Sequence, residues 1–130
     1  MTMLVELGEW LEDQAVGTVG TNLFLGRLPD TPDAATALFE YAGAAPFHTM
    51  GPTVVWERPR LQVLCRAADY ATARSQAETI YQLLDVVAET TIESVRYHQI
   101  EALQSPFLVQ RDANDRPVIG CNYEVWRDVT

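Results

Sequence analysis

Four side chains in the sequence are of a type that supports nucleophilic or metal chemistry: Cys65, Cys121, His48 and His98. A histidine within hydrogen-bond reach of a cysteine would activate its thiol as a nucleophile. The two cysteines form no CxxC motif, however, and a zinc site needs about four closely spaced ligands. Cys65 also alternates with apolar residues in a strand pattern, which favours a buried, unreactive thiol.

Motifs of the common enzyme classes are missing from the sequence. It contains no GxSxG, no HExxH and no glycine-rich phosphate-binding loop. We therefore expect no catalytic residue, no cofactor and no metal ion, and a protein that is not an enzyme.

Length and composition indicate one ordinary globular domain over residues 1–130, with 48% hydrophobic and 21% charged residues. The net charge is −9, and all the basic residues are arginines. This negative charge disfavours wrapping of duplex DNA, because binding of phosphates needs basic patches. It does not argue against DNA passing nearby, because an acidic channel would repel DNA and keep it from sticking. No apolar run is long enough to cross a membrane, and no signal peptide is present. We expect a protein that stays in the cytosol where it is made.

Two segments have helical periodicity. Leu4, Leu7 and Leu11 recur on one face of a short N-terminal helix. A second, longer helix is predicted over residues 69–89, with Asp69 as its N-cap. At about 1.5 Å per residue it would be about 30 Å long, enough to lie across a small sheet.

The other segments predict strands, because apolar and polar residues alternate along them. Imperfect alternation in residues 91–104 indicates a bulge, and Pro59 indicates a strand start or a sheet edge. Residues 107–126 are predicted to form a hairpin. The fold class is α+β: a mostly antiparallel sheet with one long helix packed across it and a shorter N-terminal helix. The predicted strands are residues 22–27, 37–41, 57–66, 91–104, 107–109 and 118–126.

Residues 42–52 are predicted to form a loop, because they are rich in glycine and proline. This loop and the residues just after it carry much apolar surface, which covers either the protein's own core or a neighbouring chain. Arg58 and Arg60 follow, and they share one strand face with Arg66. These arginines either pair with acidic residues of a neighbouring chain or remain solvated. The candidate interface residues are Phe47, His48, Met50, Trp56, Arg58 and Arg60.

Several fragments, taken in order, resemble the minor capsid or tail terminator family of long-tailed bacteriophages. Together they cover nearly the whole chain. They are residues 20–33 (GTNLFLGRLPDTPD), 41–46 (YAGAAP), 57–63 (ERPRLQV), 69–74 (DYATAR), 103–107 (LQSPF), 111–112 (RD), 116–117 (RP) and 122–125 (NYEV).

The resemblance implies a structural virion protein, made in the host cytoplasm, that forms a hexameric ring in the neck. Such a ring caps the tail tube and joins it to the head connector, and DNA passes through it without specific binding. The implied partners are further copies of the chain, the major tail tube protein and a connector or stopper protein. A head-completion or stopper protein is an alternative of similar size and acidity, and a small binding module outside virions is an alternative of another class.

Overall fold

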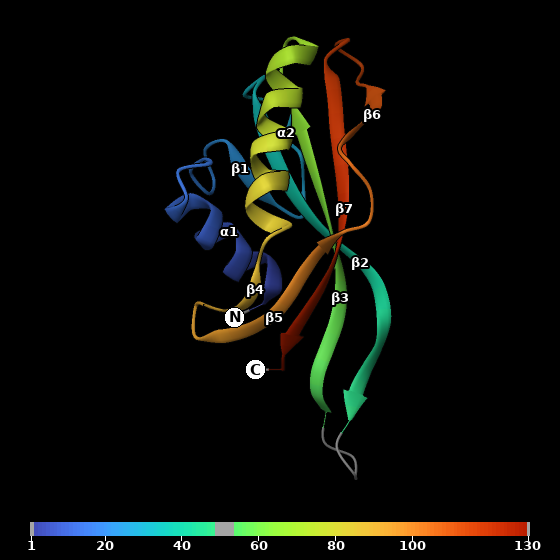
Figure 1. Ribbon diagram of the computed structural model, residues 1–130. Helices are drawn as coiled ribbons and strands as arrows, with labels where there is room; N and C mark the ends of the chain where they lie inside the picture. Colours follow the sequence, from blue (N-terminus) through green and yellow to red (C-terminus); the bar gives the residue numbers. More distant parts are fainter. Residues whose placement is uncertain (1, 49–53, 130) are drawn as a thin grey trace.

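The computed structural model describes residues 2–48 and 54–129, and the helices lie against one curved sheet (Figure 1). The strand order is β1-β2-β3-β7-β5-β4, and β6 also pairs with β7. β1 and β2 run parallel, and the other pairs described run antiparallel. The α+β class with a mostly antiparallel sheet is therefore confirmed. The elements are α1 (Met3–Asp13), β1 (Leu23–Leu25), β2 (Ala35–His48), β3 (Val54–Arg66), α2 (Tyr70–Leu84), β4 (Ala88–Ile92), β5 (Val95–Ala102), β6 (Phe107–Arg111) and β7 (Pro117–Asp128).

The core lies between the sheet and the two helices. Leu7 and Leu11 of α1 and Ile80 and Leu84 of α2 are fully buried there. They pack against those residues of the central strands whose side chains point toward the helices, and these residues are buried as well. Burial of each such side chain stabilises the fold by about 1.5–3 kcal/mol. The helices cover one face of the sheet, and we call the opposite face, which carries Arg58, Arg60, Asn122, Glu124 and Trp126, the outer face.

The second helix is shorter than predicted. Asp69 is its N-cap as expected, since its carboxylate accepts a hydrogen bond from the Thr72 amide. The helix ends at Leu84, after 15 residues, rather than at residue 89. Val87 is buried at the position where the helical stripe would place an apolar residue, so the periodicity did not reveal the end. At this point the Asp85 carboxylate accepts a hydrogen bond of 2.9 Å from the Ala102 amide. This bond holds the end of the helix against β5. No helix in the described part of the chain is long and apolar enough to span a membrane.

The predicted strand at residues 91–104 is in fact part of a hairpin between β4 and β5. Its turn is Glu93-Ser94, and both residues have positive φ angles, +49° and +69°. Such two-residue turns normally carry Asn or Gly, so the sequence contained no turn signal. The expected bulge is present, as a register shift between Tyr97 and Gln99 against β7. The hairpin predicted over residues 107–126 is confirmed by the pairing of β6 with β7.

The prediction of a loop at residues 42–52 was wrong for residues 42–48, which belong to a strand, and residues 49–52 lie outside the described residues. β2 continues to His48, β3 begins at Val54, and the two strands form a long hairpin arm that projects past the helices (Figure 1). Register shifts between Tyr41 and His48 absorb the residues that disfavour a regular strand. Pro59 likewise lies inside β3, in a stretch that has no partner in either described ladder, rather than at a strand start or an edge.

Candidate functional site

An aromatic cluster joins the arm to the end of β7. Phe47 and Trp56, both proposed as interface anchors, face each other across the arm with ring centroids 5.5 Å apart. Trp126 stacks on Phe47 at 5.8 Å and meets Trp56 edge-on at 5.5 Å. His98 completes the cluster 5.6 Å from Trp56. The predicted residues therefore pack on their own chain, yet they remain at the surface, with Phe47 39% exposed.

The sequence did not lead us to include Trp126 and His98 among the interface residues. The alternation that buries Tyr123 and Val125 places Trp126 on the opposite face of the last strand. A large aromatic residue on that face was the signal that could have identified it. Of the other predicted interface residues, His48 is exposed at the end of β2. Met50 lies outside the described residues.

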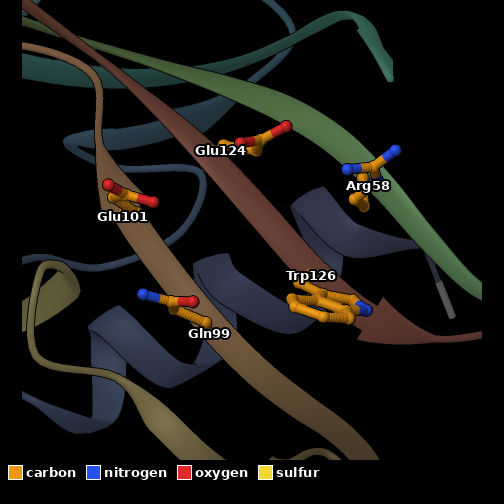
Figure 2. Close-up of a pocket in the computed structure, with 5 residues that line it drawn as sticks. All are labelled: Arg58, Gln99, Glu101, Glu124 and Trp126. Atoms are coloured by element: carbon orange, nitrogen blue, oxygen red, sulfur yellow. The ribbon is translucent and has the colours of Figure 1, made fainter. Parts of the chain in front are cut away.

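The predicted arginines extend the aromatic cluster along β3. The Arg58 guanidinium lies 4.6 Å above the Phe47 ring, a cation–π contact. It also lines a hollow of about 160 Å³ with Gln99, Glu101, Glu124 and Trp126. Figure 2 shows these five side chains on one face of the sheet, with α1 behind it. The site is thus part aromatic and part charged, as the centre and rim of protein interfaces are.

Arg66 does not belong to this surface, although the strand pattern grouped it with Arg58 and Arg60. It is buried at the far end of β3, where its guanidinium donates to the carbonyl oxygens of Pro32 at 2.6 Å and Asp33 at 3.2 Å. Arg66 therefore fixes the loop before β2, and the prediction that it shares a solvated strand face was wrong.

Several polar atoms of the outer face are buried without a hydrogen-bond partner in the described part of the chain. They are the Nε atoms of Arg58 and Arg60, Asn122 Oδ1 and Trp126 Nε1. Leaving such an atom unpaired costs about 1–3 kcal/mol, so native proteins rarely tolerate several together. Three further atoms of this kind found in the described residues, Glu6 Oε2, Tyr123 Oη and Arg127 Nε, lie on the helix-covered side.

On the helix-covered side, a buried ionic network supports the base of the arm. The Glu6 carboxylate of α1 accepts hydrogen bonds from the Tyr97 hydroxyl at 2.6 Å and from Arg127 at 2.7 Å. Arg127 also pairs with Glu57 of β3. The network links the N-terminal helix to β3, β5 and β7, the strands that carry the aromatic cluster.

His98 lies between two carboxylates at the edge of the aromatic cluster. Its Nε2 is 2.7 Å from Asp128 Oδ1, and its Nδ1 is 3.3 Å from Glu89 Oε1. The hydrogen bond to Asp128 is the largest influence and raises the pKa of His98, partial burial opposes it, and Glu89 adds to the rise. The charged imidazolium is therefore favoured by folding.

We expect the stability of the protein to fall as the pH rises through the folded pKa of His98. Because folding raises this pKa, the contribution is fully present below the unfolded value of about 6.5 and is lost above the folded one. Unfolding in denaturant at several values between about pH 5 and 8 measures it. His98→Asn should flatten the profile, because it removes the group whose pKa folding raises. Equal slopes for the wild type and His98→Asn would contradict the assignment.

The remaining candidates for chemistry are occupied in packing. Both cysteines are free and buried, as expected. Burial raises the pKa of the Cys65 thiol to about 12, and burial also raises the pKa of Cys121. A thiol with so high a pKa stays protonated near neutral pH and is a poor nucleophile.

A family model for the bacteriophage tail terminator protein matches residues 10–128. The chain belongs to the bacteriophage tail terminator family. The resemblance seen in the sequence is therefore confirmed, and the chain is a structural component of the virion tail rather than a member of a known enzyme family.

Solved structures share the fold of this tail terminator family member at low sequence identity. A chain from the virion of a native gene transfer agent particle matches with a TM-score of 0.61 and 14% identity, covering 99% of this chain and 100% of that one. A second solved chain matches with a TM-score of 0.53 and 12% identity, covering 97% of this chain and 89% of that one. No curated protein sequence matches the chain.

Proposed function

We propose that the protein forms a hexameric ring that caps the head-proximal end of the tail tube and joins it to the head connector. Membership of the tail terminator family carries this proposal. The ring lies in the neck of the virion, contacts the major tail tube protein on one side and a connector or stopper protein on the other, and is assembled from chains made in the host cytoplasm. With a net charge of −9 the subunits line an acidic bore, through which DNA passes without specific binding.

The outer face along the arm and the end of β7 supplies the contact between neighbouring subunits in this proposal. Phe47, Trp56 and Trp126 provide an aromatic centre, and Arg58 and Arg60 lie beside it. Tryptophan and arginine dominate the energetics of many interfaces, especially where water is excluded around them. His48, at the end of β2, and Met50 extend the contact and touch the neighbouring subunit or the tube.

The test replaces one aromatic ring on each of two surfaces. Phe47→Ala should weaken ring assembly by roughly thirtyfold or more, the effect of losing an interface residue worth about 2 kcal/mol. Phe107→Ala is the matched control, because Phe107 on β6 is also 39% exposed but lies away from the arm. Sedimentation velocity and negative-stain images report assembly, and thermal melts report folding. If Phe107→Ala alone blocks assembly, the contact is at β6 and the assignment to the arm is wrong.

The place in the virion is tested separately. Antibody labelling of intact particles should mark the neck, between the head and the tail tube. Labelling at the distal end of the tail or along the tube would contradict the terminator role.

A further inference from the structure

We propose that Arg58 and Arg60 on the outer face receive the acidic side chains of α1 from the next subunit, so that a charge pair fixes the head-to-tail order of the ring. The inference rests on the proposed ring and names the surface that each subunit offers to its neighbour. In the following paragraphs the α1 acidic patch means Glu9, Asp13 and Glu93.

The first observation is the state of the two arginines. The ion pairs found in the described residues engage Arg74, Arg96, Arg111, Arg116 and Arg127, and neither Arg58 nor Arg60 is among them. Both are half-buried, and the Nε of each lacks a hydrogen-bond partner there. Within the subunit Arg58 has the Phe47 ring and one long hydrogen bond, of 3.5 Å, from Nη2 to the Ala45 carbonyl oxygen. A carboxylate that bound the partly desolvated guanidinium with two hydrogen bonds would be more favourable.

The second observation is an acidic surface on the other side of the molecule, whose three acids take part in none of the ion pairs found among residues 2–48 and 54–129. Asp13 and Glu93 are exposed and Glu9 is half-buried. Glu9 and Asp13 lie one turn apart on α1, and Glu93 is in the turn between β4 and β5. Desolvation and the negative charges of Glu9 and Asp13 raise the pKa of Glu93. Like charges held together without a cation favour a basic partner.

The third observation is the placement of the two surfaces. α1 lies behind the sheet when the hollow is viewed from the front (Figure 2), so the patch and the arginines are on opposite faces of the subunit. A ring of identical chains needs such a heterologous contact, in which two different surfaces of each subunit meet. A contact between identical faces would instead give a closed dimer.

The hollow also contains its own acids, which direct the approach. Glu101 of β5 and Glu124 of β7 lie directly opposite each other in the ladder and both line the hollow, and Glu124 is also the direct cross-strand partner of Arg60 on β3. They repel an incoming carboxylate over β7 and β5, so the favourable position is over β3, at Arg58 and at the side of Arg60 away from Glu124. Repulsion of this kind sets the register of an interface.

The test reverses the charge on each surface and then mixes the two variants. Arg58→Glu with Arg60→Glu, and separately Glu9→Arg with Asp13→Arg, should each weaken assembly roughly a hundredfold, because like charges then meet at every contact. In an equimolar mixture, subunits that alternate around the ring restore an attractive pair at every contact. We therefore expect rings from the mixture and from neither variant alone, scored by sedimentation, by negative-stain images and by capping of purified tail tubes.

Controls separate this inference from its alternatives. Arg74→Glu with Arg111→Glu carries the same change in net charge on other surfaces and should assemble normally. If the arginine reversals prevent folding, Arg58→Gln with Arg60→Gln should weaken assembly about tenfold and reduce its salt dependence. Normal rings from either reversed variant, or no rings from the mixture of folded variants, would overturn the pairing while wild-type rings leave the proposed function standing. Failure of the wild type to form rings in solution and on tubes would overturn both.

Discussion

Glu6→Ala should lower the free energy of unfolding by about 3 kcal/mol or more, because it leaves the buried Arg127 charge without its main partner. The Glu6 side chain is fully buried and that of Arg127 is 5% exposed. The same substitution removes the acceptor of the Tyr97 hydroxyl. The loss should extend to the arm, since Arg127 also holds Glu57 of β3. Urea unfolding followed by circular dichroism measures the change.

Two variants calibrate this expectation. Tyr97→Phe removes one hydrogen bond and should cost about 1 kcal/mol. Arg74→Ala breaks an exposed pair with Glu78 on α2 and should change stability by less than about 1 kcal/mol. If Glu6→Ala is no more destabilising than Arg74→Ala, the buried network does not support the fold as we describe.

Gly43→Ala should separate β2 from β3 at the base of the arm and cost about 3 kcal/mol, the upper end of the usual penalty for overpacking. A methyl group at Gly43 would collide with the carbonyl oxygen of Arg58 and come within 2.9 Å of the Pro59 Cα, and both are backbone atoms. Backbone cannot move aside as a side chain does, so the strands must part. The aromatic cluster should then loosen, which near-ultraviolet circular dichroism and tryptophan fluorescence would detect.

Gly120→Ala is the matched comparison. There the added methyl would meet Val109 Cγ2 at 2.6 Å and Leu64 Cδ2 at 3.1 Å, both at the ends of side chains that can change rotamer. We expect a smaller loss of stability and an unchanged aromatic signal. Equal effects at the two glycines would show that the arm tolerates rearrangement at its base, and this would also weaken the case for a rigid interface there.

The sequence by itself determined the class of the fold, most of its elements and the family. Apolar residues recurring every three or four positions located both helices, Asp69 marked the start of α2, and alternation located the central strands with Leu61 and Tyr123 inward. These signals are local, because they depend on the repeat of the helix or strand that carries them. Family resemblance rested on fragments in a fixed order, which also survives in the linear chain.

Tertiary structure decided where elements end and which residues share a surface. The hairpin arm forms because β2 and β3 pair with each other, and bulges in this pairing accommodate Gly43 and Pro59. No local sequence pattern predicts that pairing. Trp126 and His98 join Phe47 only because β7 pairs with β3 and β5 pairs with β7 in the sheet. Glu6 and Arg127, 121 positions apart, likewise meet through the packing of α1 on the sheet. Contacts between distant segments depend on the free energy of the whole packed chain. The periodicity of one segment therefore does not predict them.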